Sequence, residues 1–140
     1  MKKLATFFTL IMMTFLAACG GGEPEAPEPM EVVFDLTTEF VFEPAQVTAR
    51  AGAPITLRLN NANSAVSHSW VLVPSDIDTS ATTEEIESMA LSERVNSGEI
   101  AAGENTSINF TAPAPGRYKY VCLIAGHLEG GMVGDLVVAE

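Results

Sequence analysis

The sequence predicts an all-β domain: a Greek-key sandwich or barrel of antiparallel strands, with one short helix in a long crossover. Short runs rich in β-branched and aromatic residues recur between turn clusters such as Gly52-Ala53-Pro54 and Ala112–Gly116, a spacing typical of small all-β folds. In the run Ile55–Leu59 the apolar residues alternate with polar ones, which indicates a strand with one buried face. About six to eight such strands suit a Greek-key fold.

The chain begins with a segment that we interpret as a lipoprotein signal peptide, Met1–Ala18. Two lysines precede a long apolar run, as in secretory signals. A helix of about fifteen apolar residues spans only ~22 Å, less than the ~30 Å hydrocarbon core of a bilayer. We therefore do not expect this segment to remain as a membrane span.

The apolar run ends Leu16-Ala17-Ala18-Cys19, which resembles a bacterial lipobox. We expect cleavage before Cys19 and lipidation of that cysteine. The mature protein would then be a membrane-anchored lipoprotein on the periplasmic, extracytoplasmic side of a bacterial membrane. The alternative is an ordinary cleavage after the small residues, which would leave a soluble protein.

Residues 19–30 follow as a linker, and residues 31–140 form the folded domain. The linker is rich in Gly, Pro and Glu, a composition that stays solvated and would reach about 35 Å when extended at ~3.1 Å per residue. The domain is long enough for one sizeable core. We expect its strands near these segments: Val32–Thr37, Gln46–Ala49, Ile55–Asn60, Ser69–Val73, Thr106–Thr111, Arg117–Val121 and Gly134–Val138.

One segment of the domain has a helical pattern. Thr82-Thr83-Glu84-Glu85 fits a capping box, with Thr82 as N-cap and Glu85 at the third helical position. We expect a short helix near Thr83–Leu91. Its acidic residues are either a docking patch for a cationic partner or a solvated face that favours the helix N-terminus; they are Glu84, Glu85 and Glu87.

The residues that can ligate a metal gather in the stretch Tyr118–Met132. Cys122, His127 and Met132 are separated by four residues each time, and the only other histidine, His68, lies far upstream. One thiolate, two imidazoles and one thioether make up the ligand set of a blue copper site, with a trigonal His₂Cys plane and a weak axial Met. We therefore predict one type 1 copper, held by His68, Cys122, His127 and Met132.

Each ligand also has a simpler interpretation. His68 could be an ordinary core histidine, Cys122 an inert buried thiol, and Met132 core filling, because methionine packs in many environments. A disulfide between Cys122 and Cys19 is a further alternative in an oxidising compartment. The presence of both histidines beside a single cysteine loop favours the copper site.

The motif Cys-x₄-His-x₄-Met, preceded by an upstream His-x-Trp-Val-Leu-Val strand, resembles the cupredoxins. The pattern is most similar to that of the auracyanins, small membrane-tethered blue copper proteins of bacteria. The resemblance covers most of the region from about Glu31 to Glu140 and implies a cupredoxin-like fold, as in plastocyanin and azurin. The chain departs from the family pattern at Ser69, where relatives usually have Asn, and at Ala125, where they often have Pro.

The resemblance also implies where electrons enter and leave. In the family the second histidine reaches the surface through an apolar patch, which here would comprise the uncharged neighbours of His127: Leu123, Ile124 and Leu128. We expect these residues to dock a transient partner. The remaining aromatic residues we expect in the core rather than as electron relays: Trp70, Phe40, Phe42, Phe110, Tyr118 and Tyr120.

The charge of the chain limits its partners. Without the two lysines of the leader, five basic and 18 acidic residues remain, a formal net charge of −13. Nucleic acid is excluded as a partner, because phosphate binding requires a basic surface. The acidity either favours cationic protein partners or only maintains solubility. We expect a monomer whose partners are redox proteins, such as a cytochrome c or a membrane oxidoreductase complex.

These observations together predict a carrier of single electrons rather than an enzyme. Four protein ligands leave no open coordination position for catalysis at the metal. A nitrite-reductase-like enzyme would need further histidines, a Cys122–His127 nucleophile pair lacks an orienting third group, and zinc does not select Met. The alternative is a copper carrier or storage protein, although the exposed Met or Cys clusters typical of such proteins are absent from the sequence. Photosynthetic and respiratory chains are equally open.

Overall fold

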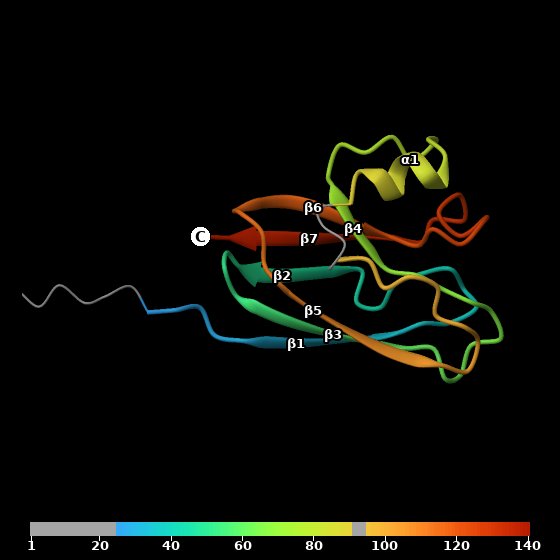
Figure 1. Cartoon of the computed structure of the whole chain (residues 1–140), viewed down its shortest axis with the longest axis horizontal. Helices are drawn as coiled ribbons and strands as arrows, with labels where there is room; N and C mark the ends of the chain where they lie inside the picture. The colour runs from blue at the N-terminus through green and yellow to red at the C-terminus, as the bar shows by residue number, and fades with distance from the viewer. Residues whose placement is uncertain (1–24, 91–94) are drawn as a thin grey trace, which may run out of the picture.

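The computed structural model describes residues 25–90 and 95–140, which form two β-sheets packed face to face (Figure 1). One sheet has the order β1-β3-β5 and the other β2-β7-β6-β4. The prediction of an all-β sandwich with one short helix is confirmed. The strands are β1 (Met30–Asp35), β2 (Gln46–Arg50), β3 (Pro54–Asn60), β4 (Val71–Pro74), β5 (Asn105–Thr111), β6 (Gly116–Val121) and β7 (Val133–Ala139).

Both sheets are mixed, so the prediction that all strands pair antiparallel is wrong. β1 pairs with β3, and β2 with β7, in parallel, whereas β3–β5, β4–β6 and β6–β7 are antiparallel. The reason is that β2 lies in the opposite sheet from β1 and β3. The chain therefore crosses the sandwich between β1 and β3 instead of turning back in a hairpin, which would have imposed an antiparallel pair.

The core between the sheets is aromatic at its centre. Trp70 and Tyr120 stack with ring centroids 5.5 Å apart, and Phe34 packs edge-on against Tyr120 at 5.2 Å. Gly134 is the strand partner of Tyr120, and a Cβ at that glycine would collide with the tyrosine ring. The prediction that Trp70, Phe42 and Tyr120 belong to the core is confirmed, with Phe110 and Tyr118 packed partly buried against it.

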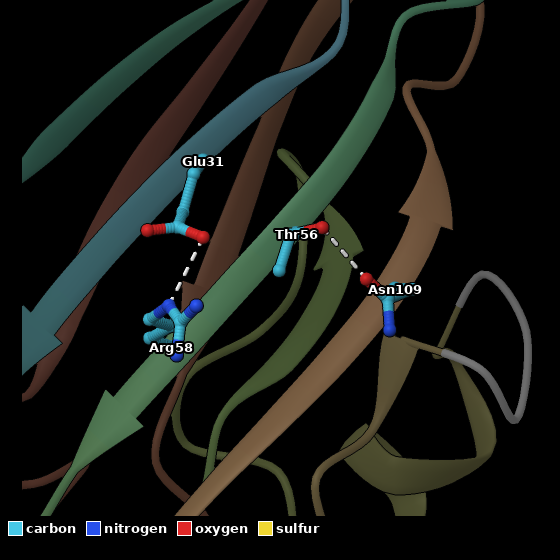
Figure 2. Close-up of polar contacts among 4 residues, drawn as sticks. All are labelled: Glu31, Thr56, Arg58 and Asn109. Carbon is cyan, nitrogen blue, oxygen red and sulfur yellow. Dashed lines mark hydrogen bonds and ion pairs between the residues drawn. The ribbon is translucent and has the colours of Figure 1, made fainter.

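The outer face of the β1-β3-β5 sheet carries polar cross-strand pairs (Figure 2). Arg58 Nε lies 3.0 Å from Glu31 Oε2, and Thr56 Oγ1 donates to Asn109 Oδ1 at 2.7 Å. Both side chains of the ion pair are at least half exposed, so it contributes no more than about 1 kcal/mol. These pairs join neighbouring strands on the solvent side, and the predicted ligands all lie elsewhere.

The helix α1 (Thr83–Ser88) lies beside β4 in the crossover between β4 and β5 (Figure 1). The predicted capping box is present: Thr82 Oγ1 accepts from the Glu85 amide at 3.3 Å, and Glu85 Oε2 accepts from the Thr82 amide at 2.9 Å. Ile86 is fully buried in a small apolar cluster with Val71, Val73 and Val121.

The helix ends earlier than the predicted Thr83–Leu91. Its C-cap is Met89, whose amide bonds the Ile86 carbonyl oxygen at 3.0 Å. This i→i+3 closure tightens the last turn and stops the α-helical pattern. The end of the predicted range, Leu91, lies outside the described residues.

β4 begins two residues later than the predicted Ser69–Val73, because the amides of Ser69 and Trp70 bond side chains instead of a neighbouring strand. The Ser69 amide donates to Cys122 Sγ at 3.3 Å, and the Trp70 amide donates to Ser97 Oγ at 2.9 Å. The irregular stretch before β4 thus brings a backbone donor to the sulfur of a predicted ligand.

The loop that follows β6 lies at one end of the sandwich, and the chain enters β1 at the other end (Figure 1). β6 runs from Gly116 to Val121 toward this loop, and β1 runs from Met30 in the same overall direction. The predicted signal peptide, 1–18, and Cys19 lie outside the described residues. Within the described part of the chain, no helix is long and apolar enough to cross a membrane.

Candidate metal centre

The loop between β6 and β7 is closed by hydrogen bonds among the predicted ligands. The Cys122 amide donates to the Met132 carbonyl oxygen at 3.2 Å, and the Met132 amide donates to the His127 carbonyl oxygen at 2.9 Å. Gly126 and Gly131 have φ of 84° and 97°, in the left-handed region that favours glycine. The loop therefore turns tightly enough to hold its cysteine, histidine and methionine at one end of the sandwich.

Three of the predicted ligands form one buried cluster. A ring nitrogen of His68, Sγ of Cys122 and a ring nitrogen of His127 all lie within 4.8 Å of one another. Cys122 Sγ lies 3.4 Å from His127 Nδ1, and the two imidazole rings are 4.9 Å apart between centroids. His68 and Cys122 are fully buried, whereas His127 is 5% exposed. The cluster thus joins the upstream histidine to the loop, as the sequence predicted.

The hydrogen bonds of His68 leave one ring nitrogen free for a metal. The Ser64 hydroxyl donates to the Val66 carbonyl oxygen at 3.1 Å, so it accepts from His68 Nε2 at 3.3 Å. Nδ1 then carries the lone pair, and it is buried without a hydrogen-bond partner among the described residues. A buried nitrogen without a partner is costly, and a metal would satisfy it. The residues present therefore fit a copper ion.

Ser69 connects the segment of the first histidine to the cysteine loop. Its amide donates to Cys122 Sγ at 3.3 Å, and its hydroxyl accepts from the Leu123 amide at 2.7 Å. The hydroxyl also lies 3.8 Å from the sulfur. Ser69 therefore links the two segments at the position where relatives of the resembled family usually have Asn.

Burial keeps all three clustered groups neutral when no metal is bound. Burial raises the pKa of the Cys122 thiol, although hydrogen bonds from the Ile124 and Ser69 amides and the Ser69 hydroxyl partly oppose this. Burial lowers the pKa of His68, with a further contribution from His127. Burial also lowers the pKa of His127, against the opposing effect of the Glu129 carboxylate. Both imidazoles are thus ready to ligate at neutral pH, and metal binding displaces only the thiol proton.

The other predicted residues surround this cluster. Met132 is fully buried at the end of the loop, beside Cys122. Leu123 and Leu128 are half-buried against the apolar cluster beneath α1, and Ile124 packs against the main core. Their partial exposure leaves apolar atoms at the surface near His127.

Three residues around the ligands were missed by sequence reasoning. Ser64 bonds His68, and the fully buried Asn61 donates to three carbonyl oxygens, of Val66, Ile100 and Ala101, at 3.0 to 3.1 Å. Phe40, predicted to lie in the core, packs half-buried against it and is also stacked on His127. The only signal for the first two is the polar cluster Asn60–Ser64, which reads as an ordinary turn, and nothing in the sequence places Phe40 beside His127.

Comparisons with known proteins agree with this geometry. Residues 30–139 match the model of the copper-binding proteins of the plastocyanin/azurin family. Auracyanin-A of Chloroflexus aurantiacus is 30% identical, over 99% of this chain and 96% of that protein. Its structure, described as a "blue" copper protein, superimposes with a TM-score of 0.64 at 29% identity, over 79% of this chain and 99% of that one. The copper-resistant cuproprotein CopI of Rubrivivax gelatinosus is 32% identical, over 84% and 70% of the two chains.

Proposed function

Because the chain belongs to the plastocyanin/azurin family of copper-binding proteins, we propose that it carries single electrons between redox partners. It is a blue copper protein with one type 1 copper, as its family and the cluster of His68, Cys122 and His127 indicate. The observation that carries the proposal is this buried cluster, in which one thiol and two imidazoles lie within 4.8 Å of one another.

The ligand roles follow from the donor types. His68, Cys122 and His127 would hold the copper through one thiolate and two imidazole nitrogens, and the fully buried Met132 would add a thioether. When bound, copper supplies the exchange between Cu(II) and Cu(I). The protein holds one thiol and two imidazole nitrogens together in a buried cluster, and such a mixture of soft and borderline donors suits both oxidation states. With four protein ligands no position stays open for a substrate, which is why we propose a carrier and not an enzyme.

We propose that partners dock around His127, on Leu123, Ile124 and Leu128. His127 is the most exposed of the three clustered ligands, and the three apolar residues beside it are each half-buried. Glu129 is exposed in the same loop, and the chain without its leader carries a formal charge of −13. These features suit a cationic redox protein such as a cytochrome c, whose encounter rate would fall as salt rises.

We propose that the protein is a lipoprotein, anchored through Cys19 on the extracytoplasmic face of a bacterial membrane. The lipobox-like sequence supports this. The loop after β6, which contains Cys122, His127 and Met132, lies at the end of the sandwich opposite to the start of β1 (Figure 1), so a membrane anchor would leave the docking end free. Labelled fatty acid should be incorporated into the wild-type protein and not into Cys19→Ser. Equal labelling of both would overturn the anchor.

The docking proposal predicts that Leu128→Lys slows electron transfer. A charged side chain at this partly buried position would disrupt the apolar contact with the redox partner. The measurement is the stopped-flow rate of reduction by a reduced cationic cytochrome c. The control is Val33→Lys, which adds the same charge at a residue 47% exposed on the opposite sheet. We expect a rate at least tenfold lower for Leu128→Lys than for Val33→Lys, with unchanged colour in both. Equal rates would contradict docking at this loop.

A second candidate function is copper resistance, favoured by the similarity to the cuproprotein CopI. A protein of that kind would bind copper to lower its toxicity, and its deletion would lower the copper tolerance of the cell. An electron carrier would instead leave tolerance unchanged and impair an electron-transport rate. Growth of a deletion strain over a copper series, compared with its respiratory or photosynthetic electron flux, separates the two functions.

A further inference from the structure

The side chain of Phe40 lies on the imidazole of His127. The two ring centroids are 4.2 Å apart, with an angle of 30° between the ring planes. Phe40 belongs to the segment between β1 and β2, so it reaches the loop from a distant part of the chain. Its ring is also close to Gly130 on that loop, where an added Cβ would lie 3.1 Å from Phe40 Cδ2. The loop backbone thus leaves space for this ring.

The backbone of Phe40 is strained. Its φ is 54°, and it is the only non-glycine residue with positive φ among the described residues. A bulky residue rarely adopts this left-handed conformation, and such outliers concentrate at functional sites. Because glycine would fit this backbone without strain, the phenylalanine at this position requires a reason in its side chain.

The two histidines are held in different ways. His68 has a hydrogen bond between Nε2 and Ser64 Oγ, at 3.3 Å, which fixes its ring plane. The ring of His127 bonds only Cys122 Sγ, through Nδ1, and among residues 25–90 and 95–140 no group bonds its Nε2. Metal-ligating histidines ordinarily have an outer partner that orients the ring. For His127 the stacked ring of Phe40 takes that place.

We propose that Phe40 is a positioning residue that fixes the plane of the His127 imidazole, with Nδ1 toward Cys122 Sγ. The proposal rests on the ligand role proposed above for His127. The order of the His127 ring can be measured in copper-free protein, however, so this inference can fail while the copper function stands. An offset aromatic stack stabilises one arrangement about 2- to 12-fold over others, which sets the size of the expected effect.

The test is nuclear magnetic resonance of the imidazole rings in copper-free protein. The chain has only two histidines, so His68 serves as an internal control within each spectrum. In the wild type we expect one ordered state for both rings. In Phe40→Ala we expect the His127 ring to become mobile, with its ordered population reduced about 2- to 12-fold, while the His68 ring stays ordered. An ordered His127 ring in this variant would overturn the proposal.

Three further variants separate the ring of Phe40 from its backbone and its bulk. Phe40→Gly removes the ring and relaxes the backbone, Phe40→Leu keeps apolar bulk without a planar face, and Phe40→Trp keeps a planar face. We expect Gly and Leu to mobilise His127 and Trp to restore its order. A His127 ring that stays ordered in Phe40→Gly or Phe40→Leu would contradict the role of stacking. Either variant replaces Phe40→Ala in the test if Phe40→Ala does not fold. In copper-loaded protein, the variants without a planar ring at position 40 should release copper to a chelator about 2- to 12-fold faster than the wild type.

Discussion

At the residue scale, the site depends on small side chains that hold the ligands from outside. Ser64 fixes the tautomer of His68, and Ser69 links the histidine segment to the loop of Cys122. The cluster of His68, Cys122 and His127 could be predicted from the ligand types and their spacing alone. These serines could not, because serine is common in turns and its partners are set by tertiary structure.

Ser69→Ala should lower the free energy of unfolding of the copper-free protein. The substitution removes the acceptor of the Leu123 amide, which is bonded at 2.7 Å in a partly buried position. An unsatisfied donor of this kind costs about 1–3 kcal/mol of the free energy of unfolding. The measurement is denaturant unfolding, with Ser69→Thr as the control that retains the hydroxyl. A stability loss in Ser69→Thr as large as in Ser69→Ala would show that the link is not the cause.

At the scale of elements, the sequence pattern predicted the positions of the strands but not their pairing. All seven predicted strands exist, and all of their ends agree within two residues. The parallel pairs β1–β3 and β2–β7 escaped prediction because alternation reports burial and carries no direction. The start of β4 could not be predicted because the amides of Ser69 and Trp70 bond side chains that are distant in sequence.

The capping box of α1 is a local device, so its loss should have a local effect. Thr82→Ala removes the acceptor of the Glu85 amide and should cost about 1 kcal/mol of the free energy of unfolding. Thr83→Ala is the matched control, because Thr83 is a neighbouring exposed threonine of the same helix. Thermal or urea unfolding compares the two variants. Equal stability of both would contradict the capping role, and the copper spectrum should be unchanged in each.

At the scale of the whole molecule, burying three titratable ligands links folding to pH. The folded pKa of His68 and His127 lies below the ordinary value of 6.5, so the unfolded chain binds more protons as pH falls below that value. The folded pKa of Cys122 lies above its ordinary value of 9.0, so the unfolded chain loses a proton first as pH rises above it. The histidines therefore destabilise the folded state below pH 6.5, and the cysteine destabilises it above pH 9.0.

The copper-free protein should therefore be most stable between pH of about 6.5 and 9. The measurement is urea unfolding across pH 5 to 10 in the presence of a copper chelator. His68→Gln is the control, because it removes one of the titrating imidazoles and should reduce the loss of stability on the acid side. A free energy of unfolding that does not fall between pH 6.5 and 5 would contradict the burial of neutral imidazoles at the site.

The measurement that tests the copper site most directly is the visible spectrum of the purified protein with one equivalent of Cu(II). The spectrum is recorded before and after addition of ascorbate, beside the variant Cys122→Ser. An intense blue or green colour that ascorbate bleaches, that an oxidant restores and that Cys122→Ser lacks is the predicted result. A colourless complex, or copper bound equally well without the Cys122 thiol, would contradict the thiolate–copper site on which the proposed electron transfer depends.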